Sequence, residues 1–376
     1  MSFYSICKEL NEAPLDTIFA SITEADVRRA LAAPSCSRED FLALMSPAAV
    51  PLLEEMAQKA SRLTQQHFGR TIHLFTPLYL SNYCSNHCVY CGFNAKNKIV
   101  RSQLELDQVE AEAKAIATTG LKHLLILTGE SRKMATPEYL DQCMEILRKY
   151  FPSVSIEIYA MEEDEYAHLV EGGVDGLTIY QETYDEELYD KLHPKGPKKD
   201  FCFRLDAPER GCNAGMRVVN IGALLGLGDW RKDAVITGMH ASYLMDKFPE
   251  TDISVSLPRM RPHAGGWQPA TIATDRDMVQ IMLAYRIFRP RVGITVSTRE
   301  NAAFRENILP LGVTKMSAGV STKVGGHAVD DEDSVGQFDI SDDRSVDEMC
   351  AMLRSRGFQP VFKDWEPIFD EAAGGV

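Results

Sequence analysis

Long apolar stretches are missing from this sequence. It contains no run of about 18 or more uncharged apolar residues, and its first residues, MSFYSICKELNEAPLD, do not place basic residues ahead of an apolar segment. The first absence argues against a membrane-spanning helix and the second against a secretory signal peptide. We therefore expect a cytoplasmic protein whose nine cysteines stay reduced, available as metal ligands or catalytic groups rather than as disulfides.

Basic residues are also in short supply. The chain has 40 Lys and Arg against 54 Asp and Glu, which gives a formal net charge of −14. Nucleic acids and anionic membranes select proteins with basic patches. This balance therefore predicts no nucleic acid and no membrane among the partners, and a solubilising surface is enough to explain the acidity.

Helix-like and strand-like segments alternate along much of the chain. With 376 residues, 45% of them apolar, it is long enough to bury a full core. Helical spacing of apolar residues, with serine caps, fills much of residues 1–70. Eight strand-like runs follow, at 71–81, 122–130, 153–161, 173–182, 217–227, 251–259, 291–298 and 312–319.

Amphipathic helical patterns separate most of these runs, at 106–120, 136–150, 230–248 and 274–288. This order predicts an α/β fold, a (βα)8 TIM-type barrel. We expect an N-terminal helical extension at 1–70, the barrel at 71–320, and a loop and helix extension at 321–376 that packs on the barrel. The active sites of such barrels lie at the C-terminal ends of the strands. Polar motifs such as TGE, YQETYD and STRE occur at these ends.

Three cysteines lie within eight positions after the first strand: Cys84, Cys88 and Cys91, spaced C-x3-C-x2-C. A structural zinc would need a fourth ligand, and His87 adjoins Cys88, where it would rarely point at the same ion. A four-iron cluster held by three cysteines leaves one iron open to a small molecule. The spacing therefore favours such a cluster over a zinc site or over cysteines that bind no metal. We expect Cys143, Cys202, Cys212 and Cys350 to be buried and to pack as small apolar side chains.

With Tyr90 before its last cysteine, this loop resembles the signature of radical S-adenosylmethionine (SAM) enzymes, whose [4Fe-4S] cluster binds the methionyl part of SAM at the open iron. The resemblance continues to the radical SAM tyrosine lyases of thiamine biosynthesis. It is carried by PLYLSNYCSNHCVYCGF, HLLILTGE, YQETYD, IGALLGLGDW, VSLPRMRP, STRENAAFRENILPLGVTKMSAGVST and FKDWE. The resemblance implies a barrel fold, with a [4Fe-4S] cluster and SAM as cofactors.

A reaction and its partners are also implied by the resemblance. These lyases cleave the Cα–Cβ bond of L-tyrosine to p-cresol and dehydroglycine, which thiazole synthase uses to build the thiazole ring. Acid–base groups do not break such a bond, so a cofactor must do so while the protein orients and shields it. By resemblance, a radical derived from SAM takes hydrogen from the substrate amino group. We expect thiazole synthase as a protein partner and a reduced flavodoxin or ferredoxin as electron donor.

The cofactor contacts that the resemblance implies come from four residues in three motifs. Gly129 and Glu130 of TGE match the motif for the methionyl amino group, with an ordinary strand-ending turn as the alternative. Glu182 matches a carboxylate placed on the ribose hydroxyls, and a solvated helix cap is the alternative. Arg204 in FRLDAPER matches an arginine for the cofactor carboxylate; otherwise it is a surface arginine.

Two further residues are expected near the adenine by the same resemblance. Gly222 in NIGALLGLGD would pack its backbone there, and Tyr90 would lie there unless it serves plain packing. The order of the glycines at 222, 226 and 228 does not match a Rossmann fingerprint.

An amino acid substrate needs a cation for its carboxylate and a polar contact for its phenol. Arg299 of STRE, after the seventh strand, is the predicted carboxylate ligand, with Ser317 on the eighth strand as a second contact. Alternatively, Arg299 pairs with Glu300 or Glu306 on a helix surface. The candidates for the ring or its hydroxyl are Tyr79, Arg261 and His263.

Three other functions remain open at this point. The maturase that makes carbon monoxide and cyanide from tyrosine carries further C-terminal cysteines, whereas here only Cys350 follows the eighth strand. Tryptophan lyase differs mainly in the ring it accommodates; the VFKDWE tail and the near full-length match favour tyrosine. A non-catalytic iron–sulfur or zinc scaffold predicts that Glu130, Arg204 and Arg299 are dispensable. The acidic residues 325–347 are expected to form a flexible loop that closes over the site or has no role.

Overall fold

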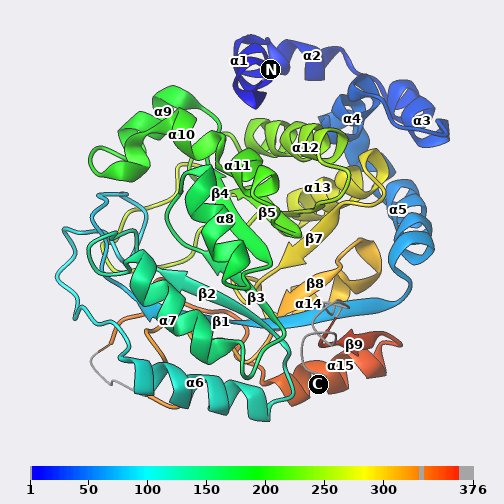
Figure 1. The fold of residues 1–376 in the computed structure, drawn as a ribbon. Helices are drawn as coiled ribbons and strands as arrows, with labels where there is room; N and C mark the ends of the chain where they lie inside the picture. The colour runs from blue at the N-terminus through cyan, green and yellow to red at the C-terminus, as the bar shows by residue number, and fades with distance from the viewer. Residues whose placement is uncertain (1, 330–333, 364–376) are drawn as a thin grey trace.

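Eight parallel strands close into a barrel in the structure, a computed structural model that describes residues 2–329 and 334–363 (Figure 1). The order is β2-β3-β4-β5-β6-β7-β8-β1, and β1 pairs with β2 to close the ring. All eight predicted runs contain a strand, so the TIM-type barrel is confirmed. The strands are β1 (Thr71–Ser81), β2 (His123–Thr128), β3 (Ser153–Glu157), β4 (Gly176–Glu182), β5 (Val218–Ala223), β6 (Asp252–Ser256), β7 (Gly293–Val296) and β8 (Lys315–Ser317).

Helices between the strands cover the outside of the barrel. Thr136 and Thr274 cap two of them by accepting a hydrogen bond from a main-chain N–H of the first turn. No helix in the described chain is long and apolar enough to cross a membrane. The helices are α6 (Leu106–Thr118), α7 (Pro137–Leu147), α8 (Glu163–Glu171), α9 (Glu186–Leu192), α10 (Phe201–Leu205), α11 (Ala207–Asn213), α12 (Trp230–Lys247), α13 (Asp275–Phe288) and α14 (Ala302–Asn307), with the 3-10 helices η2 (Pro197–Lys199) and η3 (Leu309–Leu311).

The helices that precede β1 pack on the outer side of the barrel helices. In Figure 1, the blue N-terminal helices lie along α12 and α13. Phe41 stacks on Phe288 with ring centroids 4.4 Å apart, so this segment shares the main apolar core. Its elements are α1 (Phe3–Glu12), α2 (Leu15–Ser21), α3 (Glu24–Ala32), α4 (Arg38–Met45), η1 (Pro47–Leu52) and α5 (Leu53–Phe68).

A ninth strand, which the sequence did not predict, joins the C-terminal region to the barrel. After α15 (Val346–Ser355), β9 (Gln359–Val361) pairs in parallel with Thr71–His73 at the start of β1. The strand has only three residues and contains Pro360, so it carries no strand pattern. The end of the described chain is therefore anchored at the start of the first strand.

Small and polar residues line the inside of this barrel, where large branched residues usually fill the core. Their side chains alternate along the strands and point inward. Because they are short, they leave a cavity within the barrel. These residues are Ser155, Thr178, Asn220, Ser254, Ser256, Thr295, Ser297 and Ser317.

The segment between β8 and α15 is held on the barrel by a buried ion triad. Asp342 pairs with Arg305 and with Arg344 (2.6 Å), and the side chains of Asp342 and Arg305 are fully buried. The main-chain N–H of Ser341 also donates to Thr298 O (2.8 Å). This part of the predicted flexible loop is therefore fixed, whereas 330–333 and 364–376, with the last three residues of VFKDWE, lie outside the described residues.

We expect Asp342→Asn to lower the free energy of unfolding by about 3–5 kcal/mol, because it leaves the fully buried Arg305 guanidinium and the partly buried Arg344 guanidinium without their carboxylate. Glu306→Gln is the control: Glu306 pairs with Arg356 near the surface, and its loss should cost less than about 1 kcal/mol. Urea unfolding followed by circular dichroism measures both variants. Equal shifts in the two variants would show that the triad does not stabilise the fold.

Candidate functional site

Two neighbouring cavities lie at the C-terminal ends of the strands. The larger, called here the barrel cavity, reaches from His123 to Arg299. The second, called here the loop cavity, lies beside the cysteine loop and has Tyr90 and Cys91 in its wall. The cavities meet at residues that line both: Glu157, Tyr180, Pro258, Arg299, Gln337 and Phe338.

The three cysteines of the loop after β1 lie close enough to influence one another. Burial raises the pKa of Cys91 to about 11, with a further contribution from Cys84, and burial also raises the pKa of Cys88. In the part of the chain that is described, no three metal-ligating side chains meet at bonding distances. Binding of a cluster by these cysteines would require the loop to close, and the thiols would release their protons. Three soft thiolates beside a cavity are a donor set that suits an iron–sulfur cluster.

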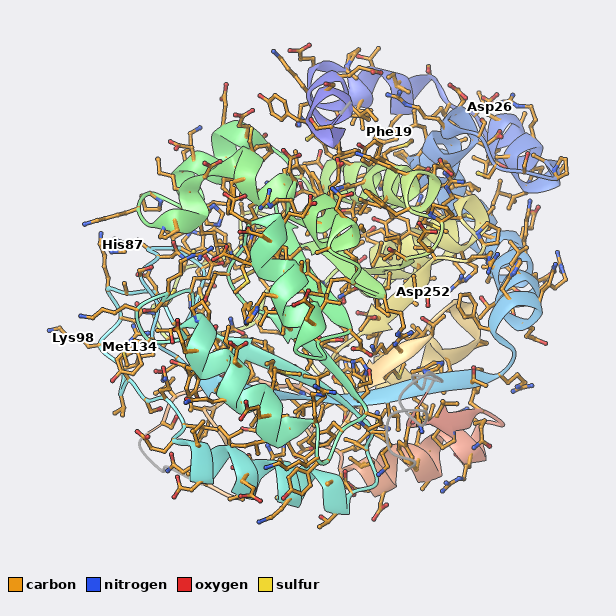
Figure 2. The ribbon with its side chains drawn as sticks, viewed as in Figure 1. Phe19, Asp26, His87, Lys98, Met134 and Asp252 are labelled. Atoms are coloured by element: carbon orange, nitrogen blue, oxygen red, sulfur yellow. The ribbon has the colours of Figure 1, made fainter. Side chains whose placement is uncertain are left out.

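The remaining predictions for thiols and histidine have mixed outcomes. Cys143, Cys212 and Cys350 are buried as predicted, but the prediction is wrong for Cys202, which is exposed on α10. This short helix turns Phe201, Arg204 and Leu205 inward, which leaves position 202 on its outer face. His87, which was considered as a zinc ligand, lies at the edge of the molecule in Figure 2.

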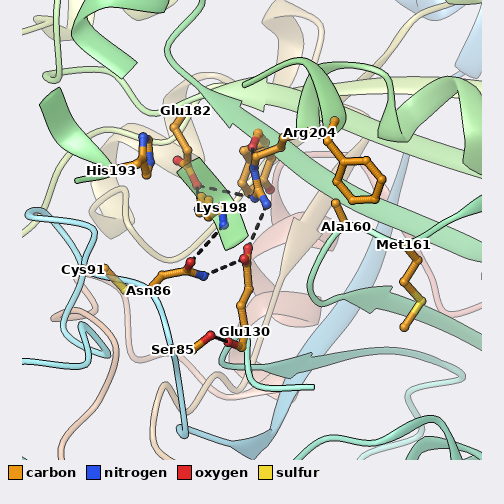
Figure 3. A network of polar contacts seen from close by, with 12 residues as sticks. Ser85, Asn86, Cys91, Glu130, Ala160, Met161, Glu182, His193, Lys198 and Arg204 are labelled. Carbon is orange, nitrogen blue, oxygen red and sulfur yellow. Dashed lines mark hydrogen bonds and ion pairs between the residues drawn. The ribbon is translucent and has the colours of Figure 1, made fainter. Parts of the chain in front are cut away.

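The TGE motif after β2 is joined tightly to the cysteine loop. A Cβ at Gly129 would lie 2.3 Å from Tyr83 O, so only glycine fits there. Glu130 then accepts hydrogen bonds from Asn86 Nδ2 (2.7 Å) in the cysteine loop and from the Arg204 guanidinium (2.8 Å) (Figure 3). The motif does more than end a strand, because its carboxylate links the cysteine loop to an arginine beyond β4.

Glu182 ends β4 in a strained conformation. Its φ of +72° is the one positive value among the non-glycine residues described, and the strand register shifts between Tyr180 and Glu182. Such strain persists only where the surroundings enforce it, often at functional sites. Burial would raise the pKa of the carboxyl, but Lys198 (2.6 Å) and Arg204 lower it overall. The helix-cap alternative is wrong, because Asp185 caps α9 and Glu182 is buried.

Sequence reasoning missed two partners of this charge network, Lys198 and His193. The Tyr90 hydroxyl bonds to His193 Nε2 (2.6 Å), and His193 Nδ1 bonds to Tyr189 O (2.8 Å). Since a carbonyl only accepts, Nδ1 carries the proton and Nε2 accepts from Tyr90. Burial, with Lys198 beside it, lowers the pKa of His193 to about 3, so the ring is neutral. Tyr90 therefore has a specific hydrogen bond besides its packing.

Arg204 on α10 and Gly222 on β5 both lie beside Tyr180 of β4. Arg204 is 7% exposed and also donates from Nε to Tyr180 O (2.7 Å), so the surface-arginine alternative is wrong. A Cβ at Gly222 would lie 1.8 Å from Ser256 O on β6. Glycine is required there for strand packing, and its predicted adenine contact remains a prediction.

Arg299 has no carboxylate partner among the residues described. Glu300 pairs with Arg259 (2.9 Å) and Glu306 pairs with Arg356 (2.7 Å), so the predicted alternative of a helix-surface ion pair is wrong. The guanidinium carbon of Arg299 instead lies 3.5 Å from the centroid of the Phe338 ring. Stacking fixes the guanidinium plane and leaves its donors available at the junction of the two cavities.

The other predicted substrate residues divide between the cavities. Ser317 and Tyr79 line the barrel cavity together with Arg299, and Ser317 Oγ accepts a hydrogen bond from Thr298 N (3.1 Å). His263 and Arg261 line the loop cavity instead. Nε2 of His263 has no hydrogen-bond partner among the residues described. The structure thus brings Arg299, Ser317 and Tyr79 together and places His263 nearer the cysteines.

Gln337, from the segment after β8, bridges the two cavities. Its Oε1 accepts from the Tyr79 hydroxyl (2.8 Å), and its Nε2 donates to Cys91 Sγ (3.9 Å). Its main-chain oxygen would lie 2.5 Å from a Cβ at Gly92, so a side chain there would push the segment away. No pattern in the acidic stretch 325–347 marks this glutamine.

Comparison with known proteins shows to which family the chain belongs. Residues 78–236 match the radical SAM superfamily, and residues 256–359 match the Biotin and Thiamin Synthesis associated domain. Together with the barrel and the three-cysteine loop, these matches define a radical SAM enzyme, with a [4Fe-4S] cluster and SAM as its cofactors. The chain is 42% identical to 2-iminoacetate synthase of Escherichia coli and 41% identical to that of Salmonella typhimurium, over 93% of each sequence. It belongs to the 2-iminoacetate synthase family.

Solved structures agree on the architecture. A crystal structure of HydG, a maturase of the [FeFe]-hydrogenase, gives a TM-score of 0.84 at 28% identity, over 96% of this chain and 79% of that one. HydG from Carboxydothermus hydrogenoformans gives 0.83 at 30% identity, over 96% and 83%. Methylornithine synthase, at 20% identity and a TM-score of 0.72, over 93% and 97%, shares the fold. The higher identity to the synthases favours their family over the maturases.

Gln337→Leu should lower the reduction potential of the cluster, because an N–H donor to a ligand sulfur stabilises the more negative reduced state. A redox titration followed by electron paramagnetic resonance measures the potential. Gln58→Leu, on the exposed face of α5, is the matched control and should leave the potential unchanged. A normal iron content with an unshifted potential in Gln337→Leu would contradict this role.

Proposed function

We propose that this chain cleaves the Cα–Cβ bond of L-tyrosine to p-cresol and dehydroglycine, the 2-iminoacetate named in its relatives, and so supplies the thiazole part of thiamine. The observation that carries the proposal is the placement of Arg299. Its guanidinium lies where a cavity inside the barrel meets the cavity that reaches Cys91. A substrate carboxylate bound there leaves the rest of an amino acid inside the barrel, beside the predicted cluster.

Arg299 binds the substrate carboxylate through its fork of N–H donors, a geometry that suits a carboxylate. Phe338 stacks on the guanidinium and holds its plane, and Ser317 is the second contact. The tyrosine side chain then occupies the barrel cavity beside Tyr79. Enclosure by the strands keeps water away from reactive species during the cleavage.

Cys84, Cys88 and Cys91 hold the cluster. When bound, the cluster and SAM supply the radical that starts the cleavage. Glu130 is the acceptor for the methionyl ammonium, and Glu182 is the acceptor for the ribose hydroxyls. Their partners are Arg204, which is also assigned the cofactor carboxylate, and Lys198. Lys198 and Arg204 lower the pKa of Glu182 and so favour its ionised form, which accepts hydrogen bonds. Tyr90 and Gly222 are assigned to the adenine, and His263 to the loop-cavity side of the substrate.

The anaerobic holoenzyme, given reductant, SAM and L-tyrosine, should form p-cresol and 5′-deoxyadenosine, measured by chromatography. Arg299→Gln should lower kcat/KM for tyrosine roughly 10- to 100-fold, the loss of a hydrogen bond to a charged group. Arg28→Gln, in an exposed pair on α3, is the control and should leave kcat/KM unchanged. Consumption of tryptophan but not tyrosine would identify a tryptophan lyase. A protein that takes up about four irons per chain but neither binds nor cleaves SAM would be a scaffold.

The protein partners belong to this proposal as well. Dehydroglycine is an imine prone to hydrolysis, which favours direct transfer to thiazole synthase, and a reduced flavodoxin or ferredoxin supplies the electrons. We place these steps in the cytoplasm, in keeping with the nine cysteines, all of which are free thiols.

Thiazole synthase should co-purify with this chain, and its presence should suppress the release of glyoxylate from dehydroglycine. Pull-down with each partner tagged in turn, and glyoxylate assays with and without the synthase, measure the two effects. Equal glyoxylate release in both assays would exclude direct transfer.

A further inference from the structure

Glu157 is a carboxylate at the junction of the two cavities that no part of the proposed reaction uses. It ends β3, and it shares the inward face of that strand with Ser153 and Ser155 because side chains alternate along a strand. It lines both the barrel cavity and the loop cavity. Within the described chain, its carboxylate forms no hydrogen bond or ion pair. A partly buried carboxylate left in this way is a site for a cation from outside the chain.

The charges around Glu157 favour the binding of a cation at its carboxylate. Burial, followed by repulsion from Glu182, raises its pKa to about 7, while Arg299 opposes the shift. Glu182 is already paired with Lys198, whereas Glu157 forms no ion pair with any residue that the structure describes. The titratable and charged groups that face it are Tyr79 of β1, Tyr180 and Glu182 of β4, Lys198, Arg204 and Arg299.

We propose that Glu157 binds the α-ammonium group of the amino acid substrate. The inference rests on the proposed function and deepens it. An α-amino acid carries a carboxylate and an ammonium on one carbon, and Arg299 and Glu157 present the two complementary charges at one junction. An ammonium held by Glu157 lies at the opening into the loop cavity, on the side of Cys91. The substrate side chain is then directed into the barrel cavity.

A comparison of the affinities for two ligands that differ only in the amino group tests this contact alone. L-Tyrosine and 3-(4-hydroxyphenyl)propanoate share the ring and the carboxylate and differ only in the amino group. In isothermal titration of the anaerobic holoenzyme, Glu157→Gln should weaken the binding of tyrosine on the order of 10- to 100-fold and leave the affinity for the propanoate within about twofold. Glu157→Asp, which keeps the charge, should recover part of the tyrosine affinity.

The dependence of affinity on pH gives a second readout. A carboxyl with a pKa of about 7 is ionised only above that value, and only the ionised form attracts an ammonium. Wild-type affinity for tyrosine should therefore rise from about pH 6 to about pH 8, while affinity for the propanoate should not rise. Glu157→Gln should abolish the rise for tyrosine.

Other outcomes would overturn the inference. If Glu157 only offsets the positive charge of Arg299 and does not contact the ammonium, Glu157→Gln will change the affinities for tyrosine and the propanoate by the same factor. If wild-type holoenzyme cleaves tyrosine and Glu157→Gln binds it normally, the inference fails while the proposed function stands. If wild-type holoenzyme neither binds nor cleaves tyrosine, the proposed function itself fails.

Discussion

A buried charge network joins the cysteine loop to the barrel, and the site depends on it. The side chains of Glu130, Glu182, Lys198 and Arg204 are between 7% and 13% exposed, and Asn86 attaches the loop to two of them. Loss of one member would leave its partners charged and unpaired away from water, which is costly. The network therefore fixes the cysteines over the strand ends while tolerating the strained backbone at Glu182.

The hollow barrel leaves a cavity close to that network. Short hydroxyl and amide side chains along β3 to β8 leave space where most barrels are filled. The segment after β8, anchored by Asp342, brings Gln337 and Phe338 to the wall between the barrel cavity and the loop cavity. The barrel cavity and the loop cavity thus share one wall, and Arg299 lies in that wall.

Sequence reasoning succeeded where local patterns determine the structure. Apolar runs predicted all eight barrel strands, and the loop that contains Cys84, Cys88 and Cys91 indicated the radical SAM superfamily that the chain matches. β9 was missed because three residues carry no pattern. Cys202 was assigned a buried role, but burial on a helix depends on which face meets its neighbours.

Residues brought in by tertiary packing could not be found in the same way. Lys198 is one of several lysines in KGPKK and shows its role only once it is seen beside Glu182. Gln337 lies in an acidic stretch with no motif. Glu157 could have been found, because it ends a predicted strand, where barrels place their chemistry. That its carboxylate forms no ion pair with the described residues is visible only in three dimensions.

The central claim is that three cysteines hold a [4Fe-4S] cluster whose fourth iron binds SAM beside this buried charge network. Electron paramagnetic resonance of the reduced cluster, recorded anaerobically before and after SAM is added, tests it most directly. The account predicts a changed spectrum, because SAM alters the ligands of one iron. An unchanged spectrum in protein with a full cluster would contradict the account.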